Sequence, residues 1–190
     1  MAGDAARAVS LRAGTPADAA AVAAIYAAFV RDSAVSFETE PPGPDEMGER
    51  MAAGGALYPW IVAEDDVGAL LGYAYAAAFR TRPAYRFTVE TTIYLRPGAE
   101  GRGLGRALYE PLLDTLTAQG FTQAIAAITL PNPASVGLHE RLGFVPAGTY
   151  RRVGWKLGAW RDVGLWQRPL AAQQNAPPEP RPWRETGLIP

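Results

Sequence analysis

Hydrophobic positions along this chain follow two kinds of spacing, and each kind predicts one type of element. Apolar side chains recur every three or four positions in four segments, as in helices that bury one face. These predicted helices cover residues 16–31, 45–53, 105–116 and 132–143. Alternating or continuous apolar runs predict strands instead. The predicted strands cover residues 9–12, 59–64, 69–79, 87–95 and 121–128, and two further extended segments lie around 144–155 and 162–168.

Turn and cap residues mark where these elements begin and end. Thr15 is the expected N-cap of the first helix, with Pro16 at its first helical position. Residues 65–68 form a turn that joins two strands into a hairpin, and Gly143 caps the last helix. The apolar run 121–128 is nearly continuous, which is typical of an interior strand covered on both faces. The order of elements therefore predicts an α+β sheet with helices on both faces.

The 190 residues are enough for one domain with its own core, which we expect to span residues 1–170. Residues 1–8 are predicted to be a loose leader. Residues 171–190 contain the run PPEPRP and little patterned hydrophobicity. We expect this segment to be mostly disordered, with a linker or a vector-derived remnant as alternatives.

Composition narrows the function classes. The net charge of −1 argues against general nucleic-acid binding, and no apolar run approaches the ~18 residues of a membrane helix. The chain has no cysteine, which excludes disulfides, thiolate metal sites and a cysteine nucleophile. Its single histidine excludes a multi-histidine metal site. We expect a cytoplasmic protein without a metal cofactor.

A glycine-rich turn between a strand and a helix is the strongest candidate for a binding site. It runs over residues 96–105 (RPGAEGRGLG) and opens the predicted helix 105–116. Backbone amides at a helix start are unpaired and point at one spot, at the positive end of the helix dipole. Arg96, Arg102 and Arg106 favour a phosphate ligand, while the alternative is a flexible loop with a helix N-cap. The spacing fits neither a Walker A loop nor the dinucleotide fingerprint.

In this context the turn resembles the acyl-CoA pyrophosphate loop of GNAT acetyltransferases, Gln/Arg-x-x-Gly-x-Gly/Ala, over a match from about residue 9 to 169. More specific segments resemble the phosphinothricin N-acetyltransferase branch, which includes methionine sulfoximine and methionine sulfone acetyltransferases. These segments are 35–41 (VSFETEP), 58–64 (YPWIVAE), 88–94 (TVETTIY), 130–132 (LPN), 138–140 (LHE) and 162–168 (DVGLWQR). One departure is Glu100, which stands where the family has Gln or Arg.

The resemblance implies the GNAT fold, with a mixed, mostly antiparallel central sheet, and acetyl-CoA as co-substrate. It implies that the backbone of Ile93, Tyr94 and Leu95 pairs with the pantetheine arm, which resembles a peptide. Asn132 matches an asparagine that contacts the same arm. The residues implied to hold the pyrophosphate are Gly101, Arg102, Gly103, Leu104, Gly105 and Arg106. The alternatives are an ordinary strand and an asparagine that caps a helix.

Glu90 is the candidate general base. It lies in the middle of the strand 87–95, where an acid has low strand propensity and is costly to bury. Alternation puts Glu90 on one face with Thr88 and Thr92. The alternatives are a solvated carboxylate or a partner for a buried arginine. The position of Glu90 matches the general base implied for the phosphinothricin branch.

Further candidates surround this strand. His139 stands where many GNAT enzymes carry a tyrosine near the CoA sulfur, so it is an assisting catalytic candidate, or else a packed structural histidine. The implied substrate-binding residues are Phe37, Arg80, Arg82 and Tyr85. The two arginines suit an acceptor with a carboxylate and a second anionic or oxide group, although they could form a basic surface loop. Phe37 could equally be a core residue.

These residues together indicate an acetyl-CoA-dependent N-acetyltransferase that acts on the α-amine of a small amino-acid-like substrate. Transfer would be direct within a ternary complex, because no cysteine exists to form an acyl-enzyme thioester. The alternatives are an acyl-CoA-binding sensor without catalysis, or an enzyme for a protein N-terminus or polyamine. Clustered arginines disfavour a cationic acceptor. The aromatic and glycine-rich stretch 154–164 resembles the dimer-forming region of the family, so we expect a homodimer.

Overall fold

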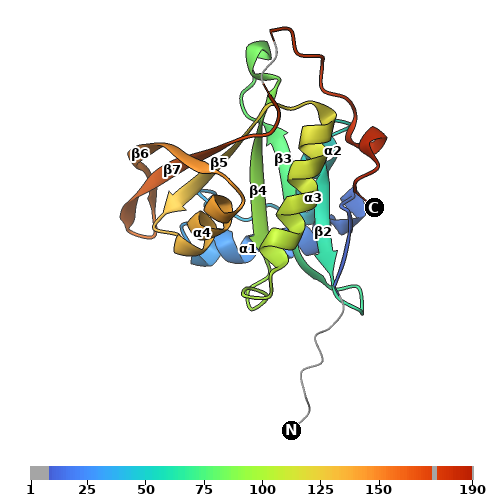
Figure 1. Cartoon of the computed structure of the whole chain (residues 1–190). Coiled ribbons are helices and arrows are strands. Elements are labelled where there is room, and N and C mark those ends of the chain that lie inside the picture. Colours follow the sequence, from blue (N-terminus) through green and yellow to red (C-terminus); the bar gives the residue numbers. More distant parts are fainter. Residues whose placement is uncertain (1–8, 173–174, 190) are drawn as a thin grey trace.

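The computed structural model describes residues 9–172 and 175–189, and these form a seven-stranded sheet with helices on both faces (Figure 1). The expected leader, residues 1–8, lies outside the described residues. The strands are β1 (Ser10–Ala13), β2 (Trp60–Glu64), β3 (Leu70–Ala78), β4 (Thr88–Leu95), β5 (Gln123–Leu130), β6 (Val145–Lys156) and β7 (Ala159–Pro169). The α-helices are α1 (Ala19–Asp32), α2 (Pro44–Ala53), α3 (Leu104–Gln119) and α4 (Pro133–Arg141). Three short 3-10 helices are η1 (Pro16–Asp18), η2 (Pro83–Tyr85) and η3 (Trp183–Thr186).

The strand order is β1-β2-β3-β4-β5-β7-β6, and every neighbouring pair is antiparallel except β4 with β5. Helices α1 and α2 cover one face of the sheet, and α3 covers the other (Figure 1). The predicted α+β fold with a mixed, mostly antiparallel sheet is therefore confirmed. The run at 121–128 becomes β5, an interior strand as predicted.

Alternation along β2 explains why the sheet has two cores. Ile61 and Ala63 pack into the core beneath α3, while Trp60 and Val62 pack into the core beneath α1 and α2. Successive side chains of a strand point to opposite faces, so five residues supply both layers. The first helix differs from its predicted start, because residues 16–18 form η1 and α1 begins at Ala19.

The one parallel pair in the described sheet opens into a wedge. Strands β4 and β5 pair over three positions, and the last of these joins Glu90 with Ile125. Beyond that pair β4 continues to Leu95 and β5 to Leu130 without further pairing between them. Strand β3 pairs with β4 along this whole length on its other edge. The edge of β4 that faces β5 is therefore available to another extended chain.

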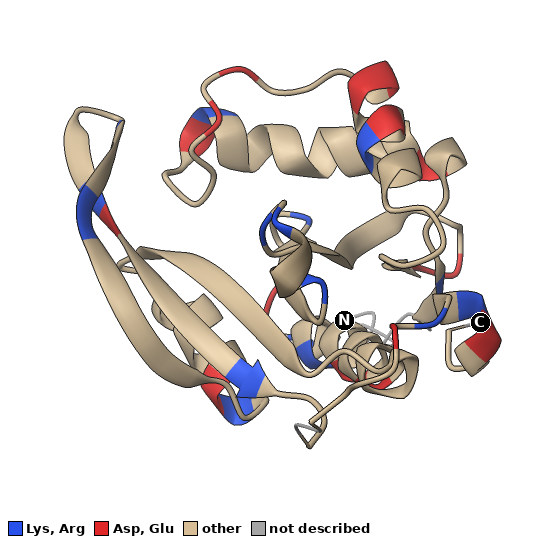
Figure 2. Cartoon of the chain, turned by 90° about the horizontal axis from the view of Figure 1, so that it is seen from above, with Lys and Arg blue, Asp and Glu red and all other residues tan. Residues whose placement is uncertain are grey.

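The hairpin of β6 and β7 forms one edge of the sheet, and its tip projects beyond the residues of β7 that pair with β5 (Figures 1 and 2). Its turn holds Leu157 and Gly158 at φ values of 52° and 71°, the left-handed conformation of a tight two-residue hairpin turn. Several large apolar side chains on it are exposed, among them Tyr150, Val153, Trp155 and Trp160.

The segment predicted to be disordered instead packs along α3 in its described part, residues 175–189. Trp183 is buried in the core beneath α3, and its backbone N–H donates to Ala56 O at 2.9 Å. The Gln119 side chain at the end of α3 donates to Leu57 O and to Arg181 O. The prediction missed this because prolines keep the segment extended, and its apolar anchors, Trp183 and Ile189, follow no helical or strand period.

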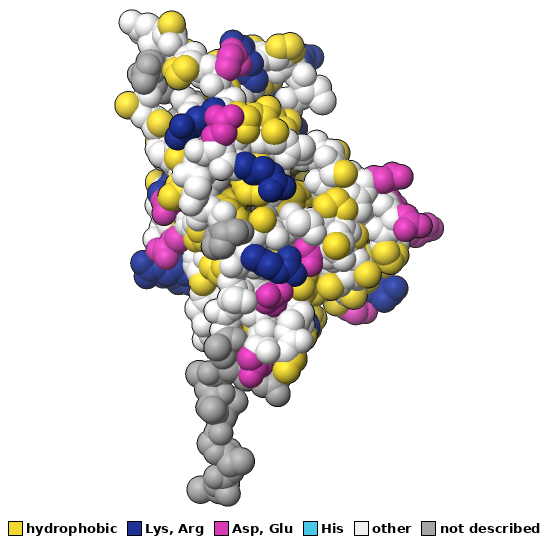
Figure 3. Space-filling model, turned by 90° about the vertical axis from the view of Figure 1, so that its right-hand side faces the viewer, with side chains coloured by type: hydrophobic (Ala, Val, Ile, Leu, Met, Phe, Trp, Pro, Cys, Tyr) yellow, Lys and Arg dark blue, Asp and Glu magenta, His cyan; other side chains and the backbone are white. Residues whose placement is uncertain are grey.

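No helix of the described residues is both long enough and apolar enough to cross a bilayer. No group of three or more acidic, histidine or cysteine side chains in the described part is arranged to hold a metal ion. On the described part of the face shown in Figure 3, basic and acidic side chains are interspersed rather than gathered by sign.

Candidate functional site

The wedge between β4 and β5 holds a small cavity of about 50 Å³, here called the wedge cavity. Residues 91–94 of β4 and 126–129 of β5 form its walls. The rest of its lining is Val35, Tyr109, Asn132, Ser135 and His139. Four residues that the sequence singled out therefore meet in one place: Ile93, Tyr94, Asn132 and His139.

The glycine turn lies at the end of β4 and leads into α3. Gly103 is the N-cap of α3 with φ at 77°, and Gly101 has φ at 75°, a region in which a side chain costs about 1–2 kcal/mol. Because glycine has no side chain, no side chain of the N-cap occupies the first amides of α3. Leu104 is buried beneath the turn, while Arg102 and Arg106 are exposed. The turn thus has the backbone donors and positive charge that a phosphate site requires.

Several residues in the turn, or next to it, already have partners within the protein. The Arg106 guanidinium pairs with Glu110 one turn further along α3 at 2.7 Å. Gly105 packs closely against α4, since a Cβ there would lie 3.0 Å from Leu138. The Glu100 carboxylate accepts a hydrogen bond from Gly98 N at 2.8 Å. Glu100, which departs from the family pattern, therefore occupies the N–H of Gly98 and adds one negative charge to the turn.

Glu90 lies on β4 at the last paired position before the wedge opens. The residue of β3 that pairs with Glu90 is Ala77, so both side chains lie on the face covered by α1 and α2. Burial raises the pKa of Glu90 above its usual range, and the positive charge of Arg80 acts in the opposite direction. A carboxylate with a raised pKa is a better proton acceptor, which suits a general base.

A larger cavity of about 460 Å³ lies on the same face as Glu90, and we call it the aromatic cavity. Its floor includes Ala77, the neighbour of Glu90. Trp60 and Tyr75 stack on each other there with ring centroids 4.0 Å apart. The remaining aromatic lining is Tyr26, Tyr58, Tyr73 and Tyr94. A pocket of this kind binds a small organic molecule by burying its apolar part.

One wall of the aromatic cavity is charged. Arg50 of α2 donates to both carboxylate oxygens of Glu38, at 2.7 and 3.1 Å. The Tyr26 hydroxyl donates to Glu38 at 2.9 Å, and burial raises the pKa of Tyr26 to about 12, so this hydroxyl keeps its proton. Bonding to Arg50 lowers the pKa of Glu38. The wall therefore holds an ion pair, and its Arg50 also pairs with Glu46 on the same helix.

His139 is buried in the wedge, with 3% of its surface exposed, and both ring nitrogens have partners. Its Nδ1 lies 2.8 Å from Ser135 O, which can only accept, so Nδ1 carries the proton. Its Nε2 lies 2.9 Å from the Tyr109 hydroxyl, which then donates. Burial lowers the pKa of His139. The ring is accordingly held neutral in one tautomer.

Asn132 lies where the wedge meets α4. Its side-chain oxygen accepts from Ser135 N at 3.1 Å, which makes it the N-cap of that helix. The alternative of a capping asparagine is thus observed. The amide nitrogen has two donors of its own, so capping leaves Asn132 able to donate into the wedge cavity that it lines.

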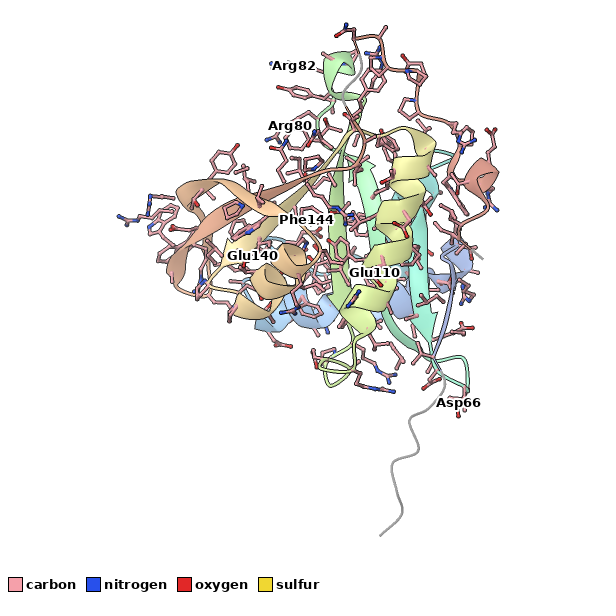
Figure 4. The ribbon with its side chains drawn as sticks, in the orientation of Figure 1. Asp66, Arg80, Arg82, Glu110, Glu140 and Phe144 are labelled. Carbon is pink, nitrogen blue, oxygen red and sulfur yellow. The ribbon has the colours of Figure 1, made fainter. Side chains whose placement is uncertain are left out.

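The four expected substrate binders are not part of the aromatic cavity lining. Arg80 and Arg82 are exposed at the end of the sheet where β4 begins (Figure 4), opposite the glycine turn. Tyr85 contacts Phe79 edge to face at 5.6 Å. Phe37 is 39% exposed and packs on the hairpin, where a Cβ on Gly154 would lie 2.2 Å from its ring. Of these four residues, Arg80 lies close enough to Glu90 for its charge to lower the pKa of that carboxyl.

Sequence reasoning missed several residues that line the two cavities, namely Tyr26, Glu38, Arg50, Tyr75, Tyr109 and Ser135. Tyr26, Tyr75 and Tyr109 look like ordinary apolar positions in their helices or strand, because their partners come from distant parts of the chain. Glu38 lies within the family-like segment 35–41 and was the one available signal.

Comparisons with known proteins agree with this geometry. The acetyltransferase (GNAT) family model matches residues 22–144. A phosphinothricin N-acetyltransferase of Streptomyces viridochromogenes is 44% identical over 174 residues, 92% of this chain and 93% of that protein. An L-methionine sulfoximine/L-methionine sulfone acetyltransferase of Pseudomonas paraeruginosa is 42% identical over 120 residues, 63% of this chain and 70% of that protein.

Among solved structures, a phosphinothricin acetyltransferase from Sinorhizobium meliloti in complex with AcCoA superposes with a TM-score of 0.86. It is 43% identical, and the match covers 90% of this chain and 94% of that one. The splayed parallel strands, the glycine turn that opens α3 and these matches lead to one conclusion. The chain belongs to the GNAT family of acetyltransferases.

Proposed function

We propose that this protein transfers the acetyl group of acetyl-CoA to the α-amine of a small amino acid with an acidic or oxidised side chain. One observation carries the proposal: Glu90 lies beside the aromatic cavity at the pair after which the wedge opens. A base in that position can take a proton from an amine that enters from the aromatic cavity. The thioester that this amine attacks would enter through the wedge.

In this proposal the glycine turn binds the pyrophosphate through the amides of Gly101, Gly103 and the first turn of α3. The free edge of β4 at residues 93–95 pairs with the pantetheine arm, and Asn132 donates to it. The relative from Sinorhizobium meliloti was solved with AcCoA, which supports acetyl-CoA as the donor. The residues present fit this ligand, because the turn offers unpaired donors and the wedge offers an unpaired strand edge.

Glu90 accepts the proton of the ammonium group, directly or through one water, and the free amine attacks the thioester carbon. The C–N bond forms, the C–S bond breaks, and the sulfur leaves as a thiolate that takes up the second proton, which the attacking nitrogen loses as the amide forms. Transfer needs no covalent intermediate, and the chain has no cysteine to form a thioester. The hydrogen bonds of His139 favour a role in orienting Tyr109 over direct proton donation.

Acceptor chemistry is inferred from charge and from the relatives. The charge of Arg80 acts on Glu90, and Arg82 is exposed two positions further along; together they favour an acceptor that carries a carboxylate and a second oxygen-rich group. The named activities of the relatives, phosphinothricin and methionine sulfoximine or sulfone acetylation, have this chemistry in common. A polyamine acceptor is disfavoured by like charge.

The test is release of CoA thiol with a panel of acceptors: phosphinothricin, methionine sulfoximine, methionine sulfone, methionine and spermidine. Because the protein has no cysteine, a thiol reagent reports only the product. We expect turnover with the first three and little with spermidine. Acetyl-CoA binding by calorimetry without turnover of any acceptor would favour a non-catalytic sensor and overturn the proposal.

We also propose a homodimer formed through the exposed aromatic side chains of the β6–β7 hairpin, including Trp155 and Trp160. Light scattering should then report twice the 20.3 kDa of one chain, and Trp160→Asp should halve that mass. A monomeric wild type would contradict the dimer. A cytoplasmic location stays a prediction from the sequence.

A further inference from the structure

Lys156 stands out first by composition. The chain has 18 lysine and arginine residues, and Lys156 is the one lysine among them. It ends β6, and although most of that strand is exposed, only 7% of Lys156 is. A buried ammonium is costly unless it is paired, so its contacts identify what it does.

The ammonium of Lys156 holds a segment that is distant in sequence. Its Nζ donates to Ser36 O at 2.6 Å, across 120 positions of the chain. The preceding carbonyl, Val35 O, accepts from Thr129 Oγ1 of β5 at 3.3 Å. Two successive carbonyls of the segment between α1 and α2 are therefore held from two different strands of the sheet.

The segment held in this way, residues 35–38, contributes one residue to the lining of each cavity. Val35 lines the wedge cavity and Glu38 lines the aromatic cavity. Between them, Ser36 is buried and its Oγ lies 2.7 Å from the hydroxyl of Tyr26. A shift of Ser36 would thus move both a cavity wall and the Tyr26 hydroxyl.

Packing of a side chain also holds residues 35–38 in place. Phe37 packs onto Gly154, two residues before Lys156, and its ring occupies the volume that a Cβ would need. The Lys156 charge also acts on Glu38, whose pKa is lowered by Arg50 first and by Lys156 to a smaller extent. The backbone of Ser36, the ring of Phe37 and the charge of Glu38 are thus all in contact with, or acted on by, the last three residues of β6.

We propose that Lys156 is a positioning residue for acceptor binding, which holds residues 35–38 where they line the wedge cavity and the aromatic cavity. The inference rests on the proposed function, since it assigns the aromatic cavity to the acceptor. Lys156 touches neither reacting group in this scheme. It acts through Ser36 and Glu38, so its loss should weaken acceptor binding more than the chemical step.

The experiment compares Lys156→Met, Lys156→Arg and the control Arg151→Met in steady-state kinetics with phosphinothricin. Arg151 is exposed on the same strand, so its replacement removes the same charge without the contact to Ser36. For Lys156→Met we expect KM for phosphinothricin to rise about tenfold, as for loss of one charge-assisted hydrogen bond, with KM for acetyl-CoA within about twofold. Lys156→Arg should recover part of the loss, and Arg151→Met should match the wild type.

The outcomes separate this inference from the proposed function. A wild type that acetylates no acceptor contradicts both. An active wild type with unchanged KM in Lys156→Met, or with only a lower melting temperature, contradicts the positioning role alone. Equal rises in both KM values would also contradict it.

A second measurement covers a Lys156→Met protein that fails to fold. Wild-type protein labelled with ¹³C at lysine Cε has one such signal, because the chain has one lysine. We expect that signal to shift when phosphinothricin saturates the protein. A signal that does not move at saturation would overturn the inference.

Discussion

The hydroxyl of Tyr109 donates to Nε2 of His139 across 2.9 Å, and this contact joins α3 to α4 inside the wedge. The rings meet edge to face with centroids 5.0 Å apart, and Phe144 packs edge to face on both of them, at 5.1 Å from His139 and 6.3 Å from Tyr109. Figure 4 shows Phe144 between these two helices. The lone histidine thus serves first as a packed, fully hydrogen-bonded group.

His139 should make the protein sensitive to mild acid. Its pKa in the folded state is lowered by burial, so the folded protein binds fewer protons than the unfolded chain. The stabilisation is complete above the unfolded pKa of about 6.5 and is lost as the pH falls through the folded value. We expect the melting temperature to fall between pH 7.5 and pH 5 in the wild type, and less in His139→Gln. An equal fall in both proteins would assign the acid sensitivity to other groups.

Replacement of Glu90 should separate activity from stability. Glu90→Gln removes the base, and kcat should fall by about 10² to 10⁴ while KM for acetyl-CoA changes little. Because burial raises the folded pKa of Glu90, its ionised form opposes folding at neutral pH, so the variant should melt at a higher temperature. Kinetics and thermal melts at pH 7.5 check the fall in kcat and the rise in melting temperature.

Wild-type kcat/KM should also rise with pH through a pKa above the usual glutamate value. Unchanged kcat in the variant would exclude Glu90 as the base.

Glu100 offers a gain in affinity. Glu100→Gln keeps an oxygen that accepts from Gly98 N but removes a negative charge beside the proposed pyrophosphate site. We expect KM for acetyl-CoA to fall about two- to fivefold at low salt, with a smaller effect at 0.5 M salt, where charges are screened. Glu49→Gln on the exposed side of α2 is the matched control. A variant that binds acetyl-CoA more weakly would show that the carboxylate stabilises the turn more than it repels phosphate.

The C-terminal segment should contribute to stability through Trp183. Trp183→Ala removes a buried ring from the core beneath α3 and should cost about 3 kcal/mol. At this chain length that corresponds to roughly 6–12 °C in melting temperature. Glu179→Ala is the control, because its ion pair with Arg86 is exposed and is expected to contribute less than ~1 kcal/mol. Similar melting temperatures for Trp183→Ala and the wild type would mean that the segment is not packed in solution.

Local patterning predicted most elements of this fold. The alternation of β2, the caps at Thr15 and Gly143 and the apolar run of β5 are properties of neighbouring residues, so they can be read from the chain. The glycine turn belongs to the same class, because its conformation depends on its own glycines. The packing of the C-terminal segment cannot be read from neighbouring residues in this way. Its two apolar anchors, Trp183 and Ile189, are stabilised by contacts with a core that other elements form.

The sequence by itself determined the order of elements, the family resemblance and the residues Glu90, Asn132 and His139 as candidates. Only the tertiary structure decided that β4 and β5 separate after Glu90, because divergence depends on how the whole sheet twists and packs. It also decided that Tyr109 reaches His139 and that Lys156 reaches Ser36. Such contacts join residues 30 and 120 positions apart, and no local spacing encodes them.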